Sequence, residues 1–458
     1  MKNNHQNLFK YLIMITVFTF AGTSNQLYSQ DTNSSETLQF SRIWEKIKTN
    51  SPSQKAALSE AEAAVISKNR SGRHWLPTIY ADAKAYATND PAVTFMSNMG
   101  QRGVTQEDFI PDNLNNPGSG NYQKGTLGLD LPLYEGGAKT EAARSMEKLA
   151  EAKKYQSSSI YLNEFSSAAS AYGQIIVLMN ITEELKSMSA RVDAVLANYQ
   201  GGLRSNLVEY SGILSLKTLQ NRIKVHMAEN DSRISALRVY LEKMSGNTLT
   251  EGWLPYKEDV TEYAVTYLKA ENLSAEGSYS VKAYQALAES SSNRAEAEKA
   301  VFLPKIGVFA ETNIYNGKRD TADSYTAGFY IRMNIFSPTD YGAVKQAELE
   351  SDAFKYRAKD AKLKGEIELN RLYTFADILK KNISLMKENT TLMNELVRNS
   401  QRLFSSGSIK AFQLVDVFSR KTDLIINLAG AEEEYLSVMA GIYNYSTDDL
   451  QGAEHETK

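Results

Sequence analysis

The sequence predicts a mixed, mainly α-helical fold in which long helices are joined to short β-strands in two tandem repeats. Three observations carry this prediction. The nine prolines leave 133–254 and 339–458 free of proline, as long helices require, because an interior proline costs about 3 kcal/mol. Several short segments alternate strictly between apolar and polar residues, which is typical of β-strands. Segments of the first half recur in the same order in the second half.

Composition excludes several classes of function. The 458 residues carry 51 Lys+Arg and 54 Asp+Glu, for a net charge of -3, so the chain has no basic excess for binding nucleic acid. The absence of cysteine excludes disulfides, thiolate metal sites and a cysteine nucleophile. The mean hydropathy of -0.40 is too polar for a bundle of membrane-spanning helices.

The N-terminus has the features of an export signal over 1–30. Lys2 and Lys10 precede an apolar run from Tyr11 to Ala21, which is shorter than the roughly 20 residues that cross a bilayer. Cleavage is expected near Ser29 or Gln30. An uncleaved anchor is the alternative.

The mature chain reads as a duplication. The run 74–79 (HWLPTI) matches 301–306 (VFLPKI), and Gly202 matches Gly407. Each half predicts a helix, a strand, a loop, a strand, a long helix, a turn and a helix. The predicted division is repeat 1 over 31–250, a linker over 251–277, repeat 2 over 278–446 and a tail over 447–458.

The predicted strands lie at about 76–88, 125–134, 303–313 and 324–336. Apolar residues alternate with polar ones in each of them, as in strands of a membrane β-barrel that face lipid on one side. A half-buried strand in a soluble sheet is the alternative for any one of them. The segments 88–122 and 316–323 are predicted to be surface loops. The lipid-facing candidates are Leu129, Leu131, Phe329 and Ile331.

The helices have a pattern that demands partners. In the second half, the apolar residues follow a spacing of four and three, which predicts a supercoiled pair of helices. Each long helix ends at a glycine, so each half predicts a helical hairpin, with tips near 200–207 and 405–412. A solvated helical rod is the alternative, but it leaves the alternating strands without a purpose. The residues of the pattern are Leu379, Ile383, Met386, Met393, Val397 and Phe404.

Four barrel strands cannot form a closed barrel alone. The unpaired edge groups of an open sheet cost several kcal/mol each in lipid, so strands from more than one chain are needed. Two copies give about eight strands and a filled interior, whereas three give about twelve and leave room for a channel.

The chain resembles the TolC family of outer-membrane efflux proteins over essentially its whole mature length. The resemblance rests on the duplication, on 76–79 (LPTI), on 131–137 (LPLYEGG) before the long helix, and on 407–409 (GSI) leading to 414–416 (LVD). The loop run 108–112 (DFIPD) is similar to loops of some members. The resemblance implies a homotrimer whose twelve-stranded outer-membrane barrel continues into a large periplasmic α-helical barrel. It also implies an exit duct that works with a periplasmic adaptor and an inner-membrane pump.

The resemblance implies functional positions at the hairpin tips. Asp416 falls where family members carry an acidic ring at the periplasmic constriction, and Gln413 stands where a second acid is frequent. Asp416 is alternatively an ordinary acid in the first turns of a helix. The tip residues Gly202, Leu203, Gly407 and Ser408 are the expected adaptor contacts.

The sequence predicts no enzyme and no cofactor. The three histidines outside the export signal lack metal-ligand spacing, and no nucleophile or phosphate-binding motif occurs. The outer-membrane component of a type I protein secretion system is the alternative within the same class. A periplasmic adaptor-like coiled-coil binding protein is the alternative from a different class.

Overall fold

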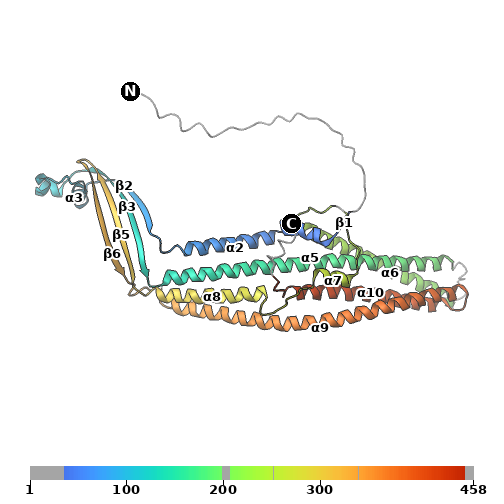
Figure 1. Ribbon diagram of the computed structural model, residues 1–458. Helices are drawn as coiled ribbons and strands as arrows, with labels where there is room; N and C mark the ends of the chain where they lie inside the picture. The colour runs from blue at the N-terminus through green and yellow to red at the C-terminus, as the bar shows by residue number, and fades with distance from the viewer. Residues whose placement is uncertain (1–35, 199–206, 251, 339, 449–458) are drawn as a thin grey trace, which may run out of the picture.

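The computed structural model describes residues 36–198, 207–250, 252–338 and 340–448. The described chain is elongated, with helices running along its length and one sheet at one end (Figure 1). The expected export signal over 1–30 and most of the tail over 447–458 lie outside the described residues. Among the described helices, none has the length and apolar character needed to cross a bilayer.

The two halves of the chain carry their elements in a similar order. The first half contains β1 (Thr37–Leu38), α1 (Phe40–Asn50), α2 (Pro52–Ser71), β2 (Thr78–Thr88), α3 (Pro91–Gly100), η1 (Gln106–Phe109), α4 (Pro111–Asn115), β3 (Gly120–Glu135), α5 (Ala138–Asn198) and α6 (Leu207–Met244). The second half contains β4 (Leu254–Pro255), α7 (Val260–Tyr267), α8 (Tyr279–Ala300), β5 (Lys305–Asn316), β6 (Thr321–Arg332), α9 (Ala343–Ser405) and α10 (Ala411–Tyr443).

The four long strands form one antiparallel sheet in the order β2-β3-β5-β6. The strand predicted over 324–336 is β6, which ends earlier, at Arg332. The register explains the difference. Arg332 pairs with Lys305, the first residue of β5, and the residue before it is Pro304, which has no N–H to donate. Residues 333–336 therefore have no partner strand. The strand predicted over 125–134 is longer, because its first residues pair with the end of β2.

The segment 88–122 is more ordered than the loop that its composition predicts. It contains α3, η1 and α4. Asp90 caps α3 by accepting a hydrogen bond from the Val93 N–H at 3.0 Å, and Pro91 occupies the first helical position. Both are favoured helix-start signals, so the sequence contained the information for this helix.

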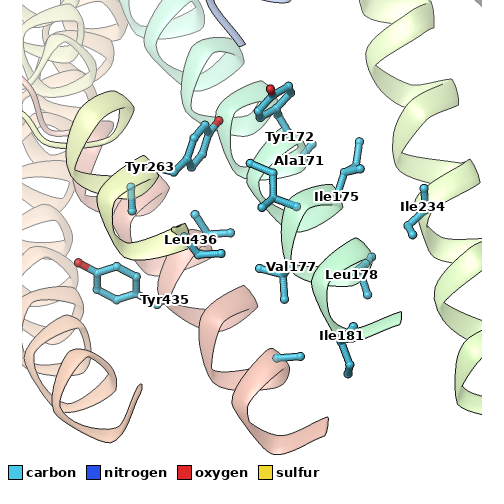
Figure 2. Packing of buried hydrophobic residues seen from close by; sticks show 14 of the residues in the cluster. Ala171, Tyr172, Ile175, Val177, Leu178, Ile181, Ile234, Tyr263, Tyr435 and Leu436 are labelled. Atoms are coloured by element: carbon cyan, nitrogen blue, oxygen red, sulfur yellow. The ribbon is translucent and has the colours of Figure 1, made fainter. Parts of the chain in front are cut away.

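The main core runs from the middle of α5 toward the hairpin tips, and part of it packs between α5, α6, α7 and α10 (Figure 2). Tyr172 of α5 is fully buried. Its hydroxyl donates to the Leu38 carbonyl at 2.7 Å and accepts from the Tyr256 N–H at 2.8 Å, so one side chain fastens the segments around β1 and β4 to the long helix. Tyr263 of α7 packs on Gly173, where a Cβ would lie 2.8 Å from its ring.

The helices pack side by side in an order that matches the sheet. Nearer the sheet, α2 packs on α5, α5 on α8 and α8 on α9. In the far half, α6 and α10 take the places of α2 and α8 (Figure 1). Along this order α2 or α6 lies at one edge and α9 at the other, just as β2 and β6 bound the sheet.

Candidate functional site

The sheet has one apolar and one polar face. In an antiparallel pair, directly opposed residues point to the same side. The register places Leu131 opposite Val308 and Val308 opposite Phe329. One row farther out, Ile79 pairs with Leu129, which pairs with Ala310. Most apolar residues of the four strands therefore share one face, whereas Phe309 lies on the other, opposite Asp130 and Gly328.

The predicted lipid-facing residues all lie on this apolar face. Phe329 and Ile331 of β6 are 77% and 67% exposed, while Leu129 and Leu131 of the inner strand β3 are half-buried. Tyr325 continues the face and is 86% exposed. Apolar side chains of this size on one continuous face indicate a surface that contacts another apolar phase.

A β-bulge interrupts the alternation of β3. Between Pro132 and Tyr134 the register shifts, so Tyr134 rather than Leu133 pairs with Ile306. Leu133 is the extra residue. The shift brings Tyr134 opposite Ile306 on the apolar face, so the strict alternation of β3 holds only as far as Pro132.

The opposite face is polar and internally bonded. The Tyr80 hydroxyl donates to the Glu311 carboxylate, the Thr126 hydroxyl to Asn313 Oδ1 at 2.7 Å, and the Tyr330 hydroxyl to Asp130 Oδ1 at 3.0 Å. Two of these rings also cover glycines. A Cβ on Gly128 would lie 2.3 Å from the Tyr80 ring, and one on Gly307 would lie 2.5 Å from the Tyr330 ring. These bonds hold the polar groups of adjacent strands flat against the sheet.

Helix α9 carries an exposed apolar stripe that the sequence analysis missed. The predicted seam is present, because Leu379, Ile383 and Val397 are buried and α9 packs along α10. At about 100° per residue, a second apolar set lies on a separate face. Its members are all exposed, from 44% at Leu396 to 59% at Leu385 and Leu392. We name the following set the α9 stripe: Ile378, Leu385, Leu392, Leu396 and Leu403.

The opposite edge of the helical layer offers a matching surface. The exposed apolar residues there come from α2 nearer the sheet and from α6 in the far half. They are Leu58, Val65, Ile66, Leu214, Val225 and Val239. The described chain thus carries unpartnered apolar surface on both edges of the same layer.

The second hairpin tip is a regular helix end. Gly407 has a φ of 77°, and the Ser408 and Gly407 N–H groups donate to the carbonyls of Leu403 and Phe404 at 2.8 and 2.9 Å. This is the Schellman arrangement, which requires a left-handed residue after the helix. Gly202 and Leu203 of the first tip lie outside the described residues.

The two candidate gate residues lie on the first turns of α10. Gln413 accepts a hydrogen bond from the Lys410 N–H at 3.0 Å, so its side chain caps the helix. Asp416 lies 3.0 Å from Arg420, with the two side chains 50% and 70% exposed. An ion pair this exposed contributes little to stability.

A buried lysine lies between the two hairpins. Lys421 of α10 is 1% exposed, and its ammonium group lies 3.7 Å from the Glu184 carboxylate of α5, beyond hydrogen-bond distance. Burial lowers the pKa of Lys421. The sequence gives no signal for this residue, because a lysine on a helix is usually solvated.

We expect Lys421→Met to stabilise the protein. Methionine has a similar volume and carries no charge to bury, and the Glu184 side chain is 53% exposed, so no buried carboxylate is left behind. Replacing buried charges by apolar groups gains about 1 kcal/mol or more. A depressed lysine pKa means that the charged form opposes folding below that pKa, so the gain is present at neutral pH and shrinks as the pH rises toward the ordinary lysine value. Thermal unfolding of both variants at several pH values measures this, and a lower Tm for Lys421→Met at neutral pH would contradict it.

Known proteins resemble this chain in structure but not detectably in sequence. No protein-family model matches the sequence, and no curated protein sequence is detectably similar. Among the described residues, no cluster of His, Asp and Glu has the arrangement of a metal site.

Solved structures do match over nearly the whole chain. CusC, whose structures describe transmembrane channel formation, has a TM-score of 0.73 at 10% identity, covering 92% of this chain and 95% of its own. The outer membrane protein VceC from Vibrio cholerae has a TM-score of 0.71 at 13% identity, covering 89% and 97%. The CmeC outer membrane channel of Campylobacter jejuni has a TM-score of 0.72 at 11% identity, covering 96% of each. The chain therefore has the fold of outer-membrane channel proteins, as its resemblance to the TolC family predicts.

Proposed function

We propose that the chain assembles as a homotrimer into an outer-membrane channel, the exit duct of a tripartite efflux system. Its sheet lies in the outer membrane and its long helices in the periplasm. The duct passively conducts small molecules that a periplasmic adaptor and an inner-membrane pump deliver, and no bond is made or broken.

The observation that carries the proposal is the order of elements across the molecule. β6 and α9 lie at one edge of the layer, and β2 with α2 or α6 lie at the other. When each copy joins its α9 edge to the α2 edge of the next, the sheet edges are brought together as well. Such head-to-tail contacts form rings when the rotation closes.

Closing the ring pairs the exposed strand edges and buries the apolar side chains at the edges of the helical layer. Strand β6 pairs with β2 of the next copy, so the barrel leaves no unpaired edge in the lipid. The α9 stripe lies in the far half of α9, where it meets the apolar residues of the neighbouring α6 and is removed from water. With the apolar face of the sheet outward, the polar face lines the bore.

The test is the state of the full chain in native membranes. We expect it in the outer-membrane fraction, released only by detergent, and migrating as a trimer whose density map shows a continuous barrel. A monomer released without detergent would overturn the proposal and favour the adaptor-like alternative. Loss of dye efflux in a deletion strain with normal protein secretion favours the efflux duct over type I secretion.

The gate assignment of Asp416 has its own prediction. Three Asp416 carboxylates around one axis favour cations, so we expect Asp416→Ala to lower the cation preference and raise the conductance of the trimer in planar bilayers. The matched control is Asp423→Ala, which removes the same charge from the same helix where it pairs with Arg222 at 3.1 Å. Unchanged ion selectivity in Asp416→Ala would remove the assignment.

A further inference from the structure

The segment between β2 and β3 folds onto the polar face of the sheet. The hydroxyl groups of Tyr86 and Ser97 lie 2.8 Å apart, and the Tyr122 hydroxyl donates to Asn98 Oδ1 at 3.4 Å. Gly100 rests on Tyr315, where a Cβ would lie 2.7 Å from the ring. The register puts all three tyrosines on the polar face. Helix α3 therefore covers the face that lines the bore in the proposed channel.

The sidedness of α3 is the reverse of that of an ordinary surface helix. Its buried residues are polar, and its exposed residues include Val93, Met96 and Met99, at 41%, 63% and 48% exposure. Because the polar side packs on the wall, the apolar side is directed away from the wall. Phe109 and Ile110, at 63% and 49% exposure, add to the apolar surface of this segment. We name the following set the cap face: Val93, Met96, Met99, Phe109 and Ile110.

A charged contact fixes this segment to the turn between β5 and β6. The Arg319 guanidinium donates to both carboxylate oxygens of Asp108 and to the Gly103 carbonyl at 2.6 Å. The Gln101 side chain accepts from the Arg319 and Asp320 N–H groups at 3.2 and 3.3 Å. The hydrogen bonds from Arg319 lower the pKa of Asp108 to about 2. Both partners are therefore charged at any physiological pH.

The radius of the proposed barrel determines which surface contacts the cap face. Twelve strands about 4.8 Å apart and tilted by about 40° enclose a radius of about 12 Å to the backbone. A helix with its side chains is about 10 Å across, so three helices on the inner wall touch one another near the axis. Lipid is excluded there, because the cap lies on the side of the sheet away from it.

We propose that the cap faces of three copies pack against one another and close the outer mouth of the channel, with the Asp108–Arg319 pair holding each cap in place. This inference rests on the proposed function. It adds a second constriction at the end opposite the periplasmic tips. Exposed methionine and phenylalanine are costly in water, and contact between the copies buries them.

Cross-linking tests the contact directly, because the chain has no cysteine of its own. In Met96→Cys trimers in outer-membrane vesicles, we expect a short bis-maleimide to give covalent dimers on denaturing gels. Ala87→Cys is the matched control: it lies near the same end of the sheet on the apolar face, so its three thiols are separated by the wall. Met99→Cys provides a second position in case Met96→Cys folds poorly.

The experiment tests the closed mouth separately from the trimeric channel. The native mass of the same preparation shows whether the chain is trimeric, and the cross-link shows whether the cap faces touch. Trimers that cross-link at position 96 and not at position 87 support the closed mouth. Trimers of Met96→Cys whose thiols stay unlinked but react with a bulky maleimide overturn it and leave the channel intact. A monomer in the native membrane overturns both.

The rate at which a reagent enters the bore from outside tests the role of the Asp108–Arg319 pair. Thr326 pairs with Glu311 on the polar face and is exposed, so Thr326→Cys reports entry of a bulky maleimide added to intact cells. Adding Asp108→Asn removes a charged partner of Arg319, and we expect labelling to become about tenfold faster, the effect of losing one charged hydrogen bond. Asp112→Asn in the same segment, where Asp112 bonds only locally to Asn116 at 3.2 Å, should leave the rate unchanged. Rapid labelling of Thr326→Cys without either change would overturn the closed state.

Discussion

Phe329→Arg should abolish assembly of the channel in the outer membrane. Phe329 is 77% exposed on the apolar face, opposite Val308, and the proposed barrel directs it into lipid. An arginine there costs about 2–4 kcal/mol, and the trimer incurs this cost in each of its copies. We expect the variant to accumulate as unassembled chain in the periplasm, with little heat-resistant trimer in the outer membrane.

The control is an arginine on the other face of the same strand. Thr326→Arg places the same charge on an exposed residue of the polar face, where the bore is wet. Its trimer yield should match that of the wild type, although its conductance falls. Normal assembly of Phe329→Arg would show that this face does not contact lipid, and equal failure of both variants would show that the strand tolerates no arginine at all.

The faces of the strands were predictable because the period of a strand is two, so a pattern of alternation names the side of each residue directly. The bulge at Leu133 was not predictable, because it is a property of the pairing between β3 and β5 and not of either strand alone. The early end of β6 has the same origin. Its partner stops at Lys305, and no feature of 333–336 shows this.

The helices, too, have some features that the sequence predicts and others that it does not. The seam through Leu379 and Ile383 is predictable because its four-three spacing is regular, and the α9 stripe repeats a similar spacing on a second face of the same helix. Two apolar faces on one helix indicate two partners, so Leu385 and Leu392 carried evidence for a neighbouring copy. The docking of α3 was hidden for a different reason. Its buried residues, such as Ser97 and Asn98, are polar, and hydropathy patterns assign polar residues to the surface.

Leu385→Glu should separate the copies without unfolding them. Leu385 is 59% exposed in the chain, so the change leaves the core of each copy intact. In the ring it faces the next copy, where burying a leucine contributes about 2 kcal/mol and burying an unpaired carboxylate costs more. Because each of the three contacts is affected, we expect monomers in detergent under conditions that keep the wild type trimeric, with unchanged helix content by circular dichroism.

Ser384→Glu separates the effect of position from that of charge. Ser384 is exposed one residue away, between Lys381 and Glu388 on the polar face of α9, so a carboxylate there stays in water and the trimer should persist. If Leu385→Glu also remained trimeric by native mass spectrometry, the α9 stripe would not be the contact between copies. The helical layer would then have to close through its other exposed residues. If both variants dissociated, added negative charge rather than a buried leucine would control assembly, and raising the ionic strength would restore the trimer because salt screens exposed charges.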